Sequence, residues 1–104
     1  MIDITKEQLL IVKHILSNLV PGIPVWIFGS RITGTAKPYS DLDLIIIDQD
    51  KLPLTTLFTI QDAFEESTLP YRVDVLDWHR INASFRKLIE RSHVVLFDSS
   101  EKSV

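Results

Sequence analysis

The segment Leu42–Ile47 is almost continuously apolar, and its length and branched side chains predict a strand that is buried on both faces at its centre. Asp41 stands directly before this segment, and Asp43 lies inside it. Because side chains alternate between the two faces of a strand, Asp41 and Asp43 project to one face while Leu42 and Leu44 project to the other. Two carboxylates this close repel each other unless one is protonated or a cation lies between them.

A hard divalent cation such as Mg²⁺ would remove that repulsion. Magnesium prefers oxygen ligands and is typically held by one or two carboxylates together with phosphate groups of a substrate. Asp41 and Asp43 are therefore predicted to bind Mg²⁺.

A Gly29-Ser30-Arg31 triplet precedes the acid pair, where a strand is expected to end and a turn or short helix to begin. Glycine lets main-chain N–H groups come close to an anion, Ser30 adds a hydroxyl, and the planar guanidinium of Arg31 suits phosphate. The alternative for Arg31 is an ion pair with Asp41 or Asp43, of the kind that surface charges often form at little gain. The triplet and the acids together predict a site for a metal-bound triphosphate.

Asp74 is the candidate for a third acid at this site. It lies between Val73 and Val75 in an alternating segment, so a strand placed beside the first acid pair would bring its carboxylate toward Asp41 and Asp43. Such a carboxylate can help to hold a second metal ion or take the proton from an attacking hydroxyl. The alternatives are a solvent-facing Asp74 that pairs with Arg72, or Asp77 in its place.

The composition describes an ordinary globular domain. The 104 residues suit a single domain over residues 1–104, and the hydrophobic fraction of 45% argues against disorder. A net charge of −3 gives no basic footprint for direct nucleic-acid binding. No cysteine is present and neither a membrane span nor a signal peptide is indicated, which favours a cytoplasmic protein.

The order of predicted elements favours an α+β fold, in which helices pack on a small sheet. Thr5 and Gln8 form a capping box for a first helix, and Pro53 begins a second helix that ends near Ser67. A third helix is expected late in the chain. The predicted spans are helices at 6–19, 54–67 and 81–91, and strands at 25–28, 42–47, 71–76 and 93–97.

The remaining polar and aromatic residues are expected to serve the structure. Ser40 is expected to bond the main chain of its own turn. Trp26 and Trp78 suit the core or a sheet edge, with contact to a partner as the alternative for Trp78. The three histidines lack the spacing of metal ligands: His14, His79 and His93.

The triplet Gly29-Ser30-Arg31, the later Asp41-Leu42-Asp43-Leu44 and the strand acid Asp74 together resemble the minimal nucleotidyltransferases of the polymerase-β superfamily. The resemblance covers residues 25–76, and the order of elements outside this core region agrees with it. The spaced combination is specific, whereas an Asp-x-Asp or a Gly-Ser alone would be weak.

This resemblance implies a polymerase-β-like nucleotidyltransferase fold, with a short mixed sheet and helices packed mainly on one face. It implies transfer of a nucleoside monophosphate, AMP from ATP, to a hydroxyl group, with pyrophosphate leaving. By the same resemblance Gly29 and Ser30 contact the β and γ phosphates, with Arg31 beside them. Asp41 and Asp43 hold two Mg²⁺ ions, and Asp74 binds one metal and activates the acceptor.

The resemblance also implies a partner. Small bacterial members are often encoded with a HEPN-domain protein, and several are antitoxins that adenylylate a tyrosine of that toxic ribonuclease. Two alternatives stay open, namely an inactive antitoxin that only binds its HEPN partner and an enzyme that modifies a small molecule such as an aminoglycoside. One departure concerns the phosphate site, because many relatives have a second arginine where this chain has Thr33, and Lys37 is the candidate to compensate.

Overall fold

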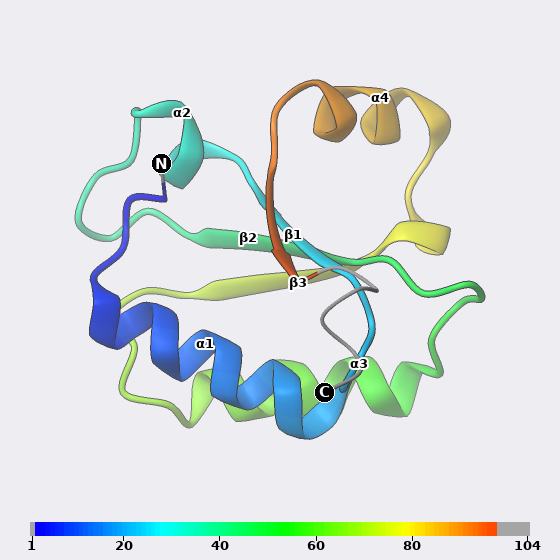
Figure 1. Cartoon of the computed structure of the whole chain (residues 1–104), viewed down its shortest axis with the longest axis horizontal. Helices are drawn as coiled ribbons and strands as arrows, with labels where there is room; N and C mark the ends of the chain where they lie inside the picture. Colours follow the sequence, from blue (N-terminus) through cyan, green and yellow to red (C-terminus); the bar gives the residue numbers. More distant parts are fainter. Residues whose placement is uncertain (1, 98–104) are drawn as a thin grey trace.

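A computed structural model of the chain describes residues 2–97 (Figure 1). Its elements follow the predicted order, with two short helices added. In chain order they are α1 Lys6–Leu19, β1 Val25–Phe28, α2 Ser30–Thr33, β2 Leu42–Ile46, α3 Leu54–Glu65, β3 Val73–Asp77, the 3₁₀ turn η1 Trp78–Arg80, α4 Ala83–Arg91 and β4 Val94–Phe97.

The four strands form one mixed sheet in the order β3-β2-β1-β4. β1 pairs antiparallel with both β2 and β4, whereas β2 and β3 run parallel. Parallel neighbours need a crossover connection, and α3 provides it between β2 and β3. The mixed sheet and the α+β class are confirmed.

The two long helices cover one face of this sheet. Figure 1 shows α1 and α3 side by side along that face, with α2 and α4 on the opposite side. The main core lies between α1, α3 and the sheet, and the strands contribute alternate residues to it: Val25, Ile27, Leu42, Leu44, Ile46, Val73 and Leu96. Most helical packing is on one face, as expected, but α4 lies over the other face, where Phe85 meets Phe28 edge to face.

Local capping explains where the helices begin. Thr5 accepts a hydrogen bond from the Gln8 amide, and the Gln8 side chain accepts one from the Thr5 amide, so the predicted capping box is confirmed. Asn82 caps α4 by accepting from the Phe85 amide, which moves the start of that helix from the predicted residue 81 to Ala83.

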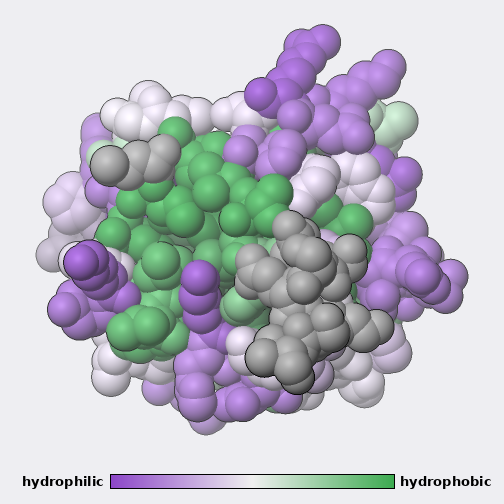
Figure 2. Space-filling view, in the orientation of Figure 1, coloured by the Kyte–Doolittle hydropathy of each residue, from purple (hydrophilic) through white to green (hydrophobic). Residues whose placement is uncertain are grey.

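β4 is an edge strand of apolar residues. It pairs with β1 on one side, and Val95 is 45% exposed. Figure 2 shows hydrophobic residues gathered on the face where β4 lies in Figure 1.

None of the helices in residues 2–97 combines the length and hydropathy that a bilayer crossing requires.

Replacing Leu44 by alanine should lower the free energy of unfolding by about 2–5 kcal/mol. The Leu44 side chain is fully buried in the core between the sheet and the two long helices, so its truncation leaves a cavity. Urea unfolding followed by circular dichroism measures this change. Leu10→Ala is the matched control, since Leu10 is 67% exposed on α1 and should lose less than about 0.5 kcal/mol. Equal losses in the two variants would contradict the core described above.

Candidate active site

The parallel pairing of β2 and β3 brings two of the predicted acids together. Asp43 and Asp74 are direct register partners, and both side chains are half-buried. They lie on the face opposite Leu42 and Val73, which enter the core. The predicted neighbourhood of the two strands is therefore confirmed.

Asp43 lies in an unfavourable environment for its charge. Burial raises the pKa of its carboxyl from 3.8 to about 6, and the nearby carboxylates of Asp74 and Asp41 add to this rise. Asp41 is exposed and precedes the first residue of β2. Asp43 therefore lies close enough to both Asp74 and Asp41 for their charges to act on it.

The Gly29 corner makes room for the Asp43 carboxylate. Gly29 follows β1 with φ 85° and ψ −159°, a conformation that is essentially confined to glycine. A Cβ atom on Gly29 would overlap Oδ2 of Asp43 and lie 3.2 Å from its Cγ. Glycine is thus required here both by the backbone and by the acid that faces it.

The helix that begins at Ser30 is a single turn. In residues 2–97, the hydrogen bonds of this turn are donated by later amides, from Ile32 to the Gly29 carbonyl and from Thr35 to the Ser30 carbonyl. The amides of Ser30 and Arg31 donate none in that part of the chain. Donors without an internal acceptor at the beginning of a helix can bind an anion.

Arg31 is turned into the protein. Its side chain is only 5% exposed, and its guanidinium donates to the main-chain carbonyls of Asp3, Lys37, Pro38 and Ser40 over 2.8–3.4 Å. Arg31 makes no ion pair with Asp41 or Asp43 within residues 2–97, so the alternative of such a pair is wrong. Its predicted phosphate contact stays a prediction.

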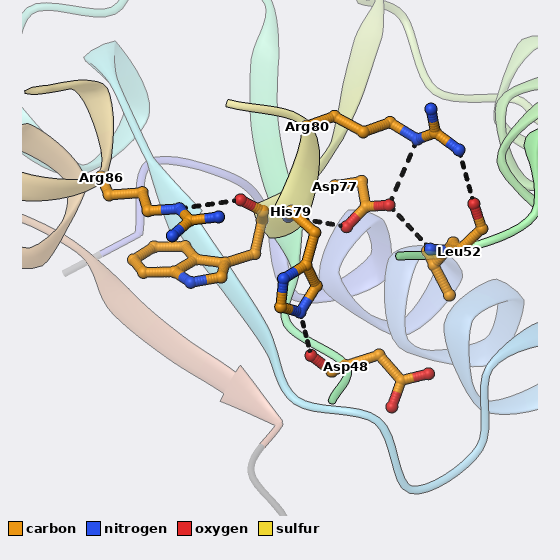
Figure 3. A network of polar contacts seen from close by, with 7 residues as sticks. Asp48, Leu52, Asp77, His79, Arg80 and Arg86 are labelled. Carbon is orange, nitrogen blue, oxygen red and sulfur yellow. Dashed lines mark hydrogen bonds and ion pairs between the residues drawn. The ribbon is translucent and has the colours of Figure 1, made fainter. Parts of the chain in front are cut away.

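Asp77, the alternative third acid, has a different environment (Figure 3). It is 2% exposed and accepts hydrogen bonds from the amides of Leu52 and His79. Arg80 pairs with it at 3.3 Å and also donates to the Leu52 carbonyl. Because its oxygens are bound internally, Asp77 fixes the loop before α3 to the turn after β3.

The aromatic residues that follow β3 are packed, as expected. Trp78 lies edge to face against Trp26 at 5.7 Å. Arg86 lies over the Trp78 ring, and Figure 3 shows the hydrogen bond that Arg86 donates to the carbonyl of Trp78. His93 stacks on Trp26 at 3.9 Å. His79 contacts the Asp48 carbonyl at 2.7 Å.

Asp43 and Asp74 could supply two of the ligands of a divalent cation. Over residues 2–97 no three His, Cys, Asp or Glu side chains are grouped as a complete metal site. Asp43 and Asp74 nevertheless provide two facing carboxylates, and Gly29 leaves the space that one of them occupies. Two carboxylates with the remaining ligands from water and substrate are what Mg²⁺ commonly uses.

Tyr71 supports Arg31, a role that the sequence did not indicate. The Tyr71 ring lies 3.9 Å from the guanidinium carbon, and its hydroxyl donates to Gln8 on α1. Residue 71 was predicted to begin the strand, which starts instead at Val73. Only the alternation of Tyr71 with Val73 signalled that its side chain faces the core.

Comparison with known proteins identifies the family. The chain matches the model of the family described as Polymerase beta, Nucleotidyltransferase over residues 10–102. A Haemophilus influenzae protein, probable protein adenylyltransferase MntA, is 48% identical over 103 residues, which are 99% of this chain and 90% of that protein.

Solved structures show the same fold at low identity. A crystal structure of a toxin–antitoxin with AMP-PNP contains a chain with TM-score 0.73 and 21% identity, covering 90% of this chain and 74% of that chain. A structure of a tri-AMPylated Shewanella oneidensis HEPN toxin in complex with MNT antitoxin gives TM-score 0.65 and 18% identity, with 90% and 75% covered.

The raised pKa of Asp43 should make stability depend on pH. Well below pH 3.8 this carboxyl is protonated in both the folded and the unfolded states, so Asp43→Asn should have its smallest effect at the acid end of the range. Between pH 4 and 6 the unfolded state ionises first, which lowers the stability of the wild type relative to Asp43→Asn, and the difference should persist above pH 6. Urea unfolding midpoints from pH 3.5 to 8 test this, with the exposed Asp62→Asn as control. A constant difference across this range would contradict the assignment.

Gly29→Ala should disturb the site more than Gly34→Ala does. Both glycines have positive φ, but a Cβ on Gly34 meets nothing within 4 Å, whereas a Cβ on Gly29 displaces Asp43. We expect both variants to lose about 1–3 kcal/mol of stability and only Gly29→Ala to lose Mn²⁺ binding. Urea unfolding and Mn²⁺ titration by electron paramagnetic resonance measure the two effects. Equal Mn²⁺ affinity in both variants would refute the proposed fit.

Proposed function

Because the chain belongs to the polymerase β-type nucleotidyltransferase family, we propose that it transfers AMP from ATP to a hydroxyl acceptor with the help of Mg²⁺. The observation that carries this proposal is the direct pairing of Asp43 with Asp74, beside a glycine that only just admits the Asp43 carboxylate. Two half-buried acids that repel each other do not stabilise the fold, so a purely structural role does not account for their pairing.

The three aspartates would have two roles, metal binding and acceptance of a proton. Asp41 and Asp43 would hold two Mg²⁺ ions, with Asp74 as a ligand of one, and when bound these ions would supply charge stabilisation for the triphosphate. Asp74 would accept the acceptor's hydroxyl proton. The acceptor oxygen then forms a bond to the α phosphorus, the bond from that phosphorus to the bridging oxygen breaks, and pyrophosphate leaves with the electron pair.

The corner after β1 would bind the phosphate tail. The amides of Ser30 and Arg31 have no acceptor among residues 2–97, and the absent side chain of Gly29 permits close approach. These features support contacts from Gly29 and Ser30 to the β and γ phosphates.

The proposed acceptor is a tyrosine of a HEPN-type partner, which makes the protein an antitoxin. The similarity to a probable protein adenylyltransferase and the shared fold with toxin–antitoxin structures support this proposal. The apolar edge strand β4 offers a surface for such a partner. We propose that the reaction takes place in the cytoplasm. A chain without cysteines forms no disulfides, so it needs no oxidising compartment.

An antitoxin that only binds its partner is the second candidate, and Thr33 favours it. Thr33 replaces the arginine expected from the family resemblance, and its hydroxyl contacts the Ser30 carbonyl and Thr35. This position therefore supplies no cation for phosphate, and Lys37 is the exposed cation in the following loop.

Incubation with α-³²P-labelled ATP, Mg²⁺ and the co-purified HEPN partner tests the enzymatic proposal. Label should move to a partner tyrosine, and Asp41→Asn, Asp43→Asn and Asp74→Asn should each lower the rate at least about 100-fold. Loss of a metal ligand removes several kcal/mol of charge stabilisation, which corresponds to two or more powers of ten in rate.

Asp62→Asn on the exposed face of α3 is the matched control and should transfer label like the wild type. Partner binding is measured for every variant in parallel. If no label is transferred while all variants still bind and neutralise the partner, the chain acts by binding alone.

A further inference from the structure

The Arg31 guanidinium connects two parts of the candidate site. Arg31 belongs to α2, the turn that begins after Gly29, and its Nε and Nη2 both donate to the carbonyl of Ser40, at 3.0 and 2.8 Å. Ser40 directly precedes Asp41. One side chain thus connects the phosphate corner to the residue before the first acid.

The same guanidinium gathers the whole loop before β2. Nη2 also donates to the carbonyls of Lys37 and Pro38, and the loop is closed by bonds from the Ser40 amide to the Lys37 carbonyl and from the Lys37 amide to the Ser40 hydroxyl. Without a cation at its centre, these converging carbonyls would repel one another. The conformation of residues 37–40 therefore requires Arg31.

The guanidinium is held from the other side as well. It stacks on Tyr71, and its Nη1 donates to the Asp3 carbonyl, while the Asp3 amide donates to the Arg31 carbonyl. Tyr71 belongs to the main core beside α1, whereas Asp74 lies on the opposite face of the sheet. Moving the guanidinium to a phosphate near Asp43 would break all of these contacts.

We propose that the Arg31 side chain is a positioning group, which sets the place of Asp41 relative to the phosphate corner by bracing residues 37–40, and that its guanidinium does not itself contact phosphate. This inference rests on the proposed function, because it assumes that Asp41 binds metal. A planar fork with five N–H donors can satisfy several carbonyls at fixed angles, which an ammonium group cannot. Charge alone should therefore not replace Arg31.

The experiment compares four variants, Arg31→Lys, Arg31→Gln, Tyr71→Leu and Asp43→Asn, with the control Arg91→Lys, which changes an exposed arginine on α4. Three quantities are measured on each folded variant: hydrogen exchange of the amides of Lys37, Tyr39 and Ser40, Mn²⁺ affinity, and kcat and KM for ATP with the HEPN partner. Tyr71→Leu removes the stacking surface without changing any charge.

Arg31→Lys and Tyr71→Leu should both speed amide exchange in residues 37–40 and weaken Mn²⁺ binding at least about tenfold, as is typical when a supporting residue of a metal ligand is lost. Their kcat should fall while KM for ATP stays within about twofold of wild type. Arg91→Lys should leave all three quantities unchanged.

A phosphate contact would give the opposite pattern and overturn the inference. Arg31→Lys would then keep its Mn²⁺ affinity and kcat, Arg31→Gln would raise KM for ATP, and Tyr71→Leu would do neither. Asp43→Asn separates this outcome from failure of the proposed function. If Asp43→Asn keeps full Mn²⁺ affinity, the metal site itself is wrong, whereas loss of affinity there but not in Arg31→Lys refutes only the positioning role.

Discussion

Asp43 and Asp74 are held opposite each other by the parallel pairing of β2 and β3, and no basic side chain forms an ion pair with either within residues 2–97. The packing beneath the two carboxylates holds them together against their mutual repulsion. Leu42 and Val73, the adjacent register pair, enter the main core on the other face. A slip of one residue in either strand would exchange acid and apolar positions, so burial of the core fixes the acids in place.

Two aspartates of the same strand, Asp74 and Asp77, lie in contrasting environments. Asp77 is almost fully buried, and its oxygens accept two main-chain N–H groups and pair with Arg80. Asp74, three residues earlier, is only half-buried and faces another acid. A buried charge with internal partners stabilises a fold, whereas a repelling pair open to solvent is suited to an external cation.

The sequence predicted what depends on alternation. The apolar run of β2 and the parity of Asp43 and Asp74 were enough to predict that these two acids share a face, and the apolar spacing of α1 with its capping box was enough to place that helix. The surroundings of Arg31 could not be predicted in this way. Its partners are main-chain carbonyls up to 28 residues distant, and carbonyls carry no residue-type signal. The placement of α4 over the acid-bearing face likewise depended on tertiary packing.

The geometry also changes the meaning of the Gly29-Ser30-Arg31 triplet. Read as a sequence, it offers three groups to a phosphate, but the guanidinium of Arg31 faces the core side while Gly29 faces Asp43. The turn therefore has two roles, since Gly29 leaves space for the Asp43 carboxylate and the Arg31 side chain holds the loop that leads to Asp41. A metal site built from residues on separate elements needs such a connection, because the position of each ligand is otherwise set only by its own loop.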